Sequence, residues 1–515
     1  MLLDLPPELR LRAAQWLCPS DFARIEACCA VLRALVAMAV PEQAAEVYGG
    51  VPVAEVFAAS HSWPRAARFA RACHGAGAAQ RLAAGDLHTA VVAVGSGRAY
   101  SFGAGSGGRL GHGEGVDAQF VPLAIGSLVE RGVRVVAVAA GREHTALVDD
   151  AGTLWTCGKE SLGQLGHGAE AARRGGPRLT PKAVAALRRA PSGGGGVRVV
   201  AVAAGCLHTL ALTDGGRVFS FGDGEVGQLG HGDTACHATP RAVEGLLAAS
   251  FVTAIAAGEA HSAAVCDRGK CFTWGQGYDE RMGRGAGGGR LGLGDDLHRN
   301  VPTLVSSLAG EKMGGLEEGG ECEGKECEEK ETEDENGTTE EGGEEAGCGG
   351  TKKVHVVGVS CGSEMTAIVS AAGALYTCGH GFGGLLGHGD EEDVLAPRRV
   401  AALCGHRVVS VSVGDSAISC LTDEGKVFTH GAGFYGQLGH GDGSHHRLPK
   451  QVTGALAGVR IVAIATGDGH AAAMSEAGRL FTWGYKSRGA LGHGRPCDAD
   501  DEHQLVPREL MINFD

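Results

Sequence analysis

The most regular feature of the chain is an alternation of apolar and polar residues at period two, interrupted by glycine-rich turns. Residues 133–139 alternate in this way and are followed by Gly141, and two further alternating stretches, 145–148 and 153–157, flank a turn. A last extended stretch ends near a proline. This period is that of a β-strand. The pattern therefore predicts four short strands in each unit of about 52–56 residues.

The same unit occurs seven times with matched internal spacing, as in the stretch FTHGAGFYGQLGHG at residues 428–441. In every copy an aromatic residue stands three places before a glycine, and a Leu-Gly pair follows that glycine, ending at Gly439 in this stretch. The fourth copy lengthens the interval and resumes at Leu291-Gly292. The seven first glycines are Gly103, Gly158, Gly222, Gly275, Gly379, Gly431 and Gly484. Seven copies with matched spacing decide the fold before any other signal is weighed.

Pairs of aromatic residues indicate which face of each sheet is buried. Phe272 and Trp274 are two residues apart, as are Phe481 and Trp483, so both members of a pair point to one face of a sheet. A sheet covered on both sides by neighbouring sheets can bury that face. We therefore predict an all-β, seven-bladed β-propeller over residues 80–515, because closing the ring leaves no free sheet edge.

The first residues differ from the rest. Residues 1–47 are poor in glycine and place leucines at helical spacing, which predicts a short helical pair, and residues 48–79 read as a helical connector. A helical pair of this size buries too little surface to fold alone. The fold class is therefore a propeller preceded by a small α-helical segment.

Residues 1–47 resemble an F-box. The start Leu-Pro-Pro-Glu-Leu at residues 5–9 and the later apolar positions match that pattern in order and spacing, although Ala13 and Ala14 stand where larger aliphatic residues are usual. The resemblance implies docking on the Skp adaptor of a cullin–RING ubiquitin ligase. The positions that it assigns to the adaptor interface are Leu5, Pro6, Leu9, Leu17, Phe22, Ile25 and Leu32. The alternative is a helical cap on one end of the repeat array.

The repeat itself, with its Leu-Gly core in every copy, resembles the regulator of chromosome condensation family over residues 80–510. That resemblance implies a seven-bladed propeller, in agreement with the number of copies. It also brings a second functional candidate, because the founding member exchanges nucleotide on a small GTPase. The plant ultraviolet-B photoreceptor shares the fold but needs a tryptophan cluster, and only Trp155, Trp274 and Trp483 fall in repeats.

Charge is concentrated in one segment. The chain carries a net charge of −14, and residues 311–350 hold 16 acidic and 3 basic residues, which accounts for −13. The rest is nearly neutral, so no general basic field for nucleic acid is expected. We expect the acidic segment to be disordered, either as a solvated spacer or as an arm that binds a basic partner.

The sequence offers little for catalysis. The spacing of the three glycines Gly431, Gly433 and Gly436 matches the sequence motif of dinucleotide-binding proteins. That motif requires a following helix that binds phosphate, and here a Leu-Gly turn follows instead. Residues equivalent by propeller symmetry are spread round a ring, so the repeated histidines should brace turns by hydrogen bonds and bind no metal. We expect no catalytic residue, no cofactor and no metal. No apolar run is long enough to cross a membrane.

The resulting functional hypothesis is an interaction protein, the substrate-recognition subunit of a Skp–cullin–F-box ubiquitin ligase, whose propeller binds an unidentified protein substrate. The alternatives are guanine-nucleotide exchange on a small Ran-like GTPase and a non-catalytic scaffold. The 17 scattered cysteines suggest reduced thiols, and hence the cytoplasm or the nucleus.

Overall fold

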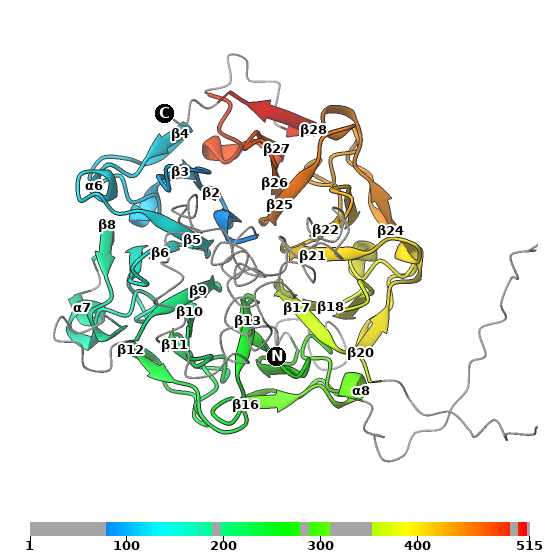
Figure 1. Cartoon of the computed structure of the whole chain (residues 1–515), viewed down its shortest axis with the longest axis horizontal. Helices are drawn as coiled ribbons and strands as arrows, with labels where there is room; N and C mark the ends of the chain where they lie inside the picture. The colour runs from blue at the N-terminus through cyan, green and yellow to red at the C-terminus, as the bar shows by residue number, and fades with distance from the viewer. Residues whose placement is uncertain are drawn as a thin grey trace, which may run out of the picture.

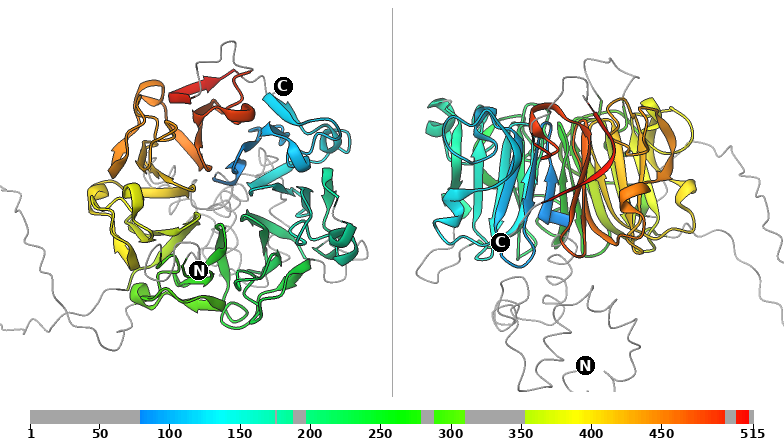
Figure 2. Two further views of the ribbon diagram at one scale, coloured as in Figure 1. Left: turned by 180° about the vertical axis from the view of Figure 1, so that it is seen from behind. Right: turned by 90° about the horizontal axis from the view of Figure 1, so that it is seen from above.

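The computed structural model describes residues 79–174, 176–187, 197–278, 288–309, 353–494 and 503–511. Within these ranges the chain forms seven four-stranded antiparallel sheets around one axis (Figure 1). Seen from the side, the sheets make a disc (Figure 2). The predicted seven-bladed propeller is thus confirmed. The F-box-like residues 1–47, the connector up to residue 78 and the acidic segment 311–350 lie outside the described residues.

Each blade is built from four consecutive strands, the first nearest the axis and the fourth outermost. Blade 1 comprises β1 (Leu82–Ala84), β2 (His88–Val92), β3 (Ala99–Ala104) and β4 (Ala118–Ala124). Blade 2 comprises β5 (Val135–Ala140), β6 (His144–Asp149), β7 (Leu154–Gly158) and β8 (Arg178–Ala183). Blade 3 comprises β9 (Val199–Ala204), β10 (His208–Thr213), β11 (Val218–Gly222) and β12 (His237–Ala242). Blade 4 comprises β13 (Val252–Ala257), β14 (His261–Cys266), β15 (Cys271–Gly275) and β16 (Arg299–Leu304).

The remaining blades repeat this plan. Blade 5 comprises β17 (Val356–Cys361), β18 (Met365–Ser370), β19 (Leu375–Gly379) and β20 (Val394–Arg399). Blade 6 comprises β21 (Val408–Val413), β22 (Ala417–Thr422), β23 (Val427–Gly431) and β24 (His446–Gln451). Blade 7 comprises β25 (Ile461–Thr466), β26 (His470–Ser475), β27 (Leu480–Tyr485) and β28 (His503–Leu510).

Short helical turns connect the strands. The α-helical turns are α6 (Gly126–Val129), α7 (Ala169–Arg174) and α8 (Ser306–Ala309). The 3-10 turns are η1 (Ala79–Arg81), η2 (Ser106–Gly108), η3 (Ala185–Leu187), η4 (Phe382–Gly384), η5 (Ala401–Leu403), η6 (Gly454–Leu456) and η7 (Ser487–Gly489). Prolines fall in the outermost strands, as Pro122 does in β4, where a missing N–H breaks no ladder.

The ring closes by packing between blades 7 and 1, because no blade shares strands from both ends of the chain. These two blades lie side by side in Figure 1. The Gly494 amide donates to the Phe120 carbonyl at 2.8 Å across this junction. Phe102 and Tyr100 of blade 1 pack in one apolar cluster with Met474 and Leu480 of blade 7.

The hydrophobic core lies between blades, as the paired aromatics predict. Trp274 packs against residues of blade 3, and Phe481 with Trp483 packs against residues of blade 6. Trp274 and Trp483 are completely buried, and each indole N–H donates to a backbone carbonyl of the preceding blade. Every blade therefore depends on its neighbour for burial of its central face.

The repeated glycines are also explained by the neighbouring blade. Gly439 has φ +77°, and a Cβ there would lie 2.9 Å from Nε1 of Trp483 in the next blade. A side chain at this position would be strained and would collide, so only glycine fits. The seven first glycines of the repeat frame all have positive φ as well. Their assignment as structural positions is consistent with this geometry.

Candidate interaction face and central channel

The two faces of the disc carry different connections. One face, here called the long-loop face, carries the turns between first and second strands and the loops between third and fourth strands. The other, the N-terminal face, carries the remaining connections and the start of β1, where η1 joins the propeller. The alternating direction of strands within each blade fixes this division.

A closed ring of glycines surrounds the axis at the long-loop face. Each glycine ends a first strand, and a Cβ on it would collide with the carbonyl oxygen of the corresponding glycine in the next blade. The members of this glycine ring are Gly85, Gly141, Gly205, Gly258, Gly362, Gly414 and Gly467, and the last faces Gly85. Seven backbones can approach the axis this closely only because no side chain stands between them.

A histidine ring lies directly outside the glycine ring and joins neighbouring blades. The Nε2 atom of each histidine lies 2.8–2.9 Å from a threonine or serine hydroxyl of the next blade. The pairs are His88 with Thr145, His144 with Thr209, His208 with Ser262, His261 with Thr366, and His470 with Thr89. The prediction that these five brace turns is therefore corrected, because their partners lie in other blades.

The hydrogen bonds determine the tautomer of these histidines, in which Nε2 carries the hydrogen. Each hydroxyl donates a hydrogen bond to a backbone carbonyl, as Thr145 does to Arg109 at 2.6 Å, so its oxygen accepts a hydrogen bond from the Nε2–H group of the histidine. Burial lowers the pKa of His144 to about 4 and that of His208 to about 3. The histidine ring is therefore neutral at pH 7 and serves as a set of hydrogen-bond donors.

The second histidine set braces loops within a blade, as predicted. In six blades the Nε2 atom lies 2.9–3.0 Å from a serine or threonine hydroxyl of the third strand. These histidines are His112, His167, His231, His388, His440 and His493. Each therefore ties the long loop of a blade to the strand that precedes it.

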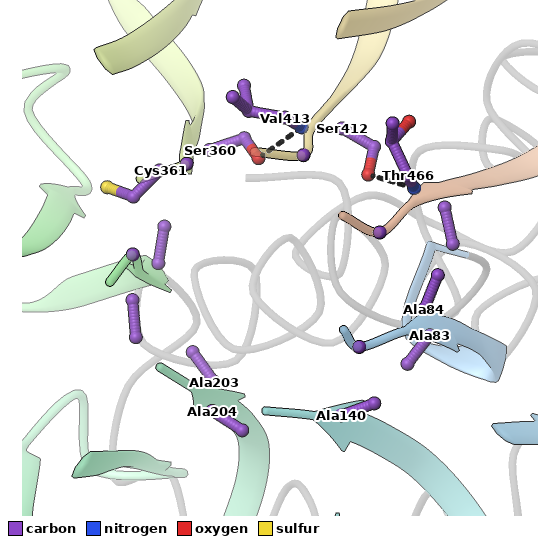
Figure 3. A pocket seen from close by; sticks show the side chains of 18 of the residues that line it. Ala83, Ala84, Ala140, Ala203, Ala204, Ser360, Cys361, Ser412, Val413 and Thr466 are labelled. Atoms are coloured by element: carbon purple, nitrogen blue, oxygen red, sulfur yellow. Dashed lines mark hydrogen bonds between the residues drawn. The ribbon is translucent and has the colours of Figure 1, made fainter. Parts of the chain in front are cut away.

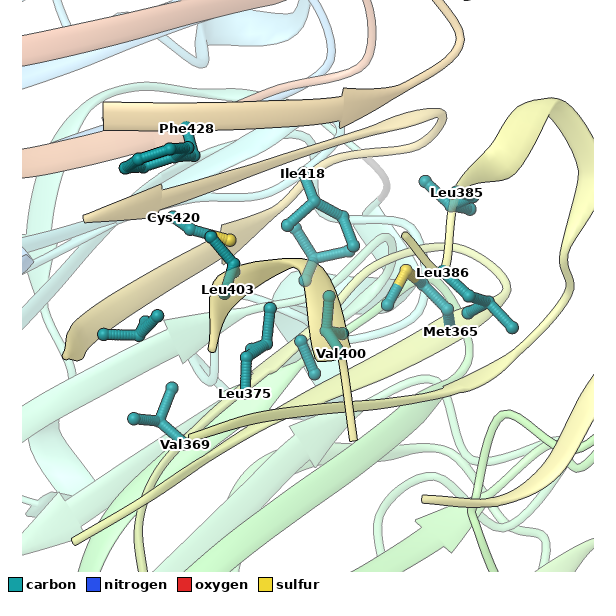
Figure 4. Close-up of a cluster of buried hydrophobic side chains, with 13 residues drawn as sticks. Met365, Val369, Leu375, Leu385, Leu386, Val400, Leu403, Ile418, Cys420 and Phe428 are labelled. Carbon is teal, nitrogen blue, oxygen red and sulfur yellow. The ribbon is translucent and has the colours of Figure 1, made fainter. Parts of the chain in front are cut away.

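The junctions between blades 5 and 6 and between blades 6 and 7 use other contacts in place of the histidine–hydroxyl pairs. Met365 and Ile418 occupy the histidine and threonine positions between blades 5 and 6, and both are buried in an apolar cluster (Figure 4). Serines on the innermost strands supply the polar contacts instead. Ser360 accepts the Val413 amide at 3.1 Å, and Ser412 accepts the amide of Thr466 at 2.9 Å (Figure 3).

His430 of blade 6 is a buried histidine that finds no partner among the described residues. It is fully buried, and neither ring nitrogen makes a hydrogen bond. Burial lowers its pKa to about 3. The same strand position holds Phe102 in blade 1 and Phe221 in blade 3, both fully buried beside the Leu-Gly glycine of the preceding blade.

We expect His430→Phe to raise the free energy of unfolding by about 1–2 kcal/mol, because it removes a buried polar group that is unpaired. The matched control is His144→Phe, which breaks the bond to Thr209 and should lower stability. Urea denaturation at neutral pH measures both. A destabilised His430→Phe variant would show that the imidazole is paired or that the phenyl ring does not fit.

The central channel is a cavity of about 520 Å³ lined mainly by small residues of the innermost strands. Alanines such as Ala84 and Ala204 face it from blades 1 to 3, and Ser360 and Ser412 face it from blades 5 and 6 (Figure 3). Gln80 of η1 crosses part of the channel, since its side-chain amide pairs with the backbone of Val202 in blade 3 at 3.3–3.4 Å.

The channel opening at the long-loop face is acidic. Asp86, Asp415 and Asp468 directly follow members of the glycine ring in blades 1, 6 and 7, and together they are called the acidic mouth. Burial and the carboxylates of Asp415 and Asp86 raise the pKa of Asp468 to about 7. Arg142 of blade 2 pairs with Asp86 at 3.3 Å. The carboxyl groups of Asp86, Asp415 and Asp468 thus share one opening, which Glu259 and Arg142 also line.

An arc of aromatic rings borders the acidic mouth on the loops of blades 5, 6 and 7. Phe382 and Phe434 are each 57% exposed, and Tyr435 is 41% exposed. The rings of this aromatic arc are His380, Phe382, His445, Phe434, Tyr435, His503 and Tyr485. Their contacting centroids are 4.2–6.5 Å apart. Large exposed aromatics grouped on one face are typical of interaction sites.

Glu364 anchors the blade 5 end of the arc. It accepts a hydrogen bond from Nδ1 of His380 at 2.7 Å, and this bond raises the pKa of His380. Asp393 lies 3.8 Å from the other ring nitrogen. His380 is therefore held between two carboxylates and stacks on Phe382.

One cluster has metal-ligating residue types. Ligand atoms of Asp223, Glu225 and Cys236 lie within 4.8 Å of one another on a loop of blade 3. Asp223 already accepts the Glu225 amide at 3.1 Å and the Cys236 thiol at 3.5 Å, and burial raises the pKa of that thiol. These contacts are those of a local turn, and we assign the cluster no metal.

The residues proposed for the adaptor interface, from Leu5 to Leu32, lie outside the described residues. Trp155, Trp274 and Trp483 fall in blades 2, 4 and 7, so they do not form a cluster. Sequence reasoning missed both the acidic mouth and the aromatic arc. The available signals were the aspartates beside repeat glycines and the additional aromatic residues in the loops of copies five and six.

The fold and this face define a propeller that acts as a protein-interaction module. The sequence profile of the Regulator of chromosome condensation (RCC1) repeat matches residues 96–148, 151–212, 215–265, 372–421, 424–474 and 477–514. The chain belongs to the RCC1 repeat family. The first five matches each begin near the third strand of one blade and end in the next blade, so the sequence repeat is offset from the structural blade.

Relatives in this family have different activities. The chain is 31% identical to the Ultraviolet-B receptor UVR8 of Arabidopsis thaliana over 418 residues, which cover 81% of this chain and 79% of UVR8. It is 32% identical to the human E3 ubiquitin-protein ligase HERC2 over 406 residues, 78% of this chain but only 7% of HERC2.

Solved structures agree on the fold. Prp20p of Saccharomyces cerevisiae, studied for binding to Gsp1p and histones, matches with a TM-score of 0.60 at 19% identity, covering 84% of this chain and 87% of Prp20p. Human WBSCR16 matches with a TM-score of 0.58 at 23% identity, covering 77% and 88%. None of the helices in the described ranges is long and apolar enough to span a bilayer.

Proposed function

We propose that this chain is a non-catalytic receptor, the substrate-recognition subunit of a Skp–cullin–F-box ubiquitin ligase. Its first 47 residues would bind the Skp-type adaptor, its propeller would bind a protein substrate, and partner subunits would transfer ubiquitin. The observation that carries the proposal is that the two faces of the disc differ. The chain joins the propeller through η1 at the N-terminal face, opposite the aromatic arc and the acidic mouth.

This difference between the faces suits a receptor that binds its substrate at the long-loop face. A receptor must bind its adaptor and its substrate simultaneously, so the two surfaces cannot overlap. The described chain begins at η1 on one face, and Phe382, Phe434 and Tyr435 are exposed on the other, which is the arrangement that such a receptor needs. The likeness to part of HERC2, itself a ubiquitin-protein ligase, supports by analogy the use of such a propeller in ubiquitin transfer.

A pull-down of the full chain with a Skp adaptor tests the proposal. We expect binding, and we expect Leu5→Ala combined with Leu9→Ala to abolish it, because both leucines would be buried at the adaptor interface. Phe434→Ala, on the opposite face, is the matched control and should bind the adaptor normally. Failure of the unmodified chain to bind any Skp adaptor would refute the ligase assignment and favour a helical cap.

The alternative of nucleotide exchange on a small GTPase is supported by likeness of fold to Prp20p alone. It predicts faster release of labelled GDP from a Ran-like GTPase by the full chain, unchanged in a variant lacking residues 1–47. The ligase proposal predicts no acceleration. This assay therefore separates the two functions independently of the pull-down.

We further propose that the protein works in the cytoplasm or the nucleus. Nine cysteines in the described ranges are free, and burial raises the pKa of Cys157 and of Cys420 to about 12. Thiols of this kind suit a reducing compartment. Imaging of the tagged full chain tests this location, and secretion would contradict it.

A further inference from the structure

We propose that the aromatic arc and the acidic mouth together bind a cationic, arginine-bearing segment of a partner protein. The inference rests on the proposed receptor function and specifies the chemistry of the segment that the propeller would receive. It is carried by exposed rings and carboxylates that adjoin on one face.

The rings and the carboxylates meet at blade 7. Gly469 follows Asp468 directly, and a Cβ on it would lie 3.1 Å from Cβ of Tyr485 and 3.2 Å from Cδ2 of Tyr435. Two tyrosines of the arc therefore cover the residue next to a carboxylate of the mouth. Their rings contact each other with centroids 5.0 Å apart.

The two features also meet at blade 6. Ser416 follows Asp415, and its hydroxyl accepts a hydrogen bond from Nε2 of Gln437 at 3.3 Å. The Gln437 side chain in turn accepts the Tyr435 amide at 2.9 Å. The loop that presents Phe434 and Tyr435 is thus fastened to the turn that presents Asp415, so their relative positions are fixed.

Charge favours a cationic occupant. Within the described ranges neither Asp415 nor Asp468 forms an ion pair, whereas Arg142 is already paired with Asp86. An arriving guanidinium would compensate carboxylates that are crowded together, and this would be favourable. Residues 311–350 of this chain carry −13 and would be repelled, so they are not the occupant.

The rings suit arginine in particular. A guanidinium stacks on exposed aromatic faces, and each such contact contributes about 0.5–1 kcal/mol at an exposed site. Phe382, Phe434 and Tyr435 provide these faces next to the mouth. A segment with several arginines could place one at the carboxylates and others on the rings.

Fluorescence anisotropy with a labelled arginine–glycine repeat peptide and the full chain tests the inference. We expect saturable binding, and little binding of the same peptide with glutamine in place of arginine. Phe434→Ala combined with Tyr435→Ala should weaken binding about tenfold, because two stacking contacts are lost. Asp415→Asn combined with Asp468→Asn should weaken binding and reduce its dependence on salt.

Two control variants separate specific from general effects. Glu225→Gln removes an exposed carboxylate from a blade 3 loop of the same face, and Leu246→Ala removes a 54% exposed apolar side chain elsewhere. Both should bind the arginine peptide as the unmodified chain does. Thermal denaturation checks that all variants fold.

Several outcomes would overturn the inference. Equal binding of the arginine and glutamine peptides would indicate a merely apolar patch. Undiminished binding by the folded arc and mouth variants would place the peptide elsewhere. Self-association abolished by the Phe434 and Tyr435 changes would make a second copy the occupant. None of these assays involves the Skp adaptor, so their failure is distinguishable from failure of the ligase proposal.

Discussion

Lowering the pH from about 7 to about 5 is expected to cost the folded propeller on the order of 10 kcal/mol, through the histidine ring alone. Burial holds the pKa of His144 and His470 at about 4 and that of His208 at about 3, and it also lowers the pKa of His88 and of His261 well below the ordinary value. In the unfolded chain these side chains titrate near their ordinary pKa of about 6.5.

The sign follows from the numbers of protons bound. Between about pH 6.5 and about pH 4 the histidines bind protons in the unfolded state but not in the folded state. The free energy of unfolding therefore falls as the pH falls. Each fully buried histidine contributes about 2 kcal/mol at pH 5, since a pKa difference of one unit corresponds to about 1.4 kcal/mol. The pKa of Asp468 is raised to about 7, so this side chain stabilises the folded state as the pH falls. It is a single group, and the five histidines outweigh it.

The chain supplies its own control for this effect. His144→Met combined with Thr209→Ile copies the Met365 and Ile418 pair found between blades 5 and 6. The double variant should lose about 2 kcal/mol less than the unmodified protein over the same pH interval. Urea midpoints measured across that interval provide the test. A midpoint independent of pH would show that the histidines are not buried and neutral.

Gly205→Ala is expected to lower the free energy of unfolding by about 3 kcal/mol, because the added Cβ has no space. It would lie 2.5 Å from the Gly258 carbonyl oxygen of the next blade and 2.6 Å from Nδ1 of His208. Gly258 belongs to the glycine ring and His208 to the histidine ring. Neither can therefore move away without opening a junction between blades.

The matched control is Gly215→Ala in the same blade. A Cβ there would lie 3.8 Å from Oγ1 of Thr213, which is an ordinary contact, so stability should change by no more than about 0.5 kcal/mol. Urea denaturation compares the two variants directly. Equal stability of both would mean that the glycine ring is not closely packed around the axis.

Local repeat chemistry made much of the fold predictable. The period-two alternation located the strands, and the predicted unit over residues 133–181 corresponds to β5 to β8 of blade 2. The paired aromatics correctly indicated cores between blades. The histidines were correctly assigned to hydrogen bonds, but only His112 and its equivalents brace loops, whereas His88 and its equivalents join blades.

The candidate site was not predictable in the same way. Asp86 and Asp468 are separated by nearly the whole propeller in sequence, and they meet only because blade 7 closes against blade 1. The aromatic arc likewise gathers rings from three successive blades. Spacing within a repeat carries no information on which copies become neighbours across the closure or how near their loops approach.

The sequence by itself determined the number of blades, the four strands of each blade and the need for glycine at recurrent places, because these depend on spacing within about fifty residues. Only the tertiary structure decided which carboxylates, rings and histidines meet, because their contacts run between blades. Closing a ring of seven sheets brings the turns at one end together round the axis, and that closure created the acidic mouth beside the aromatic arc.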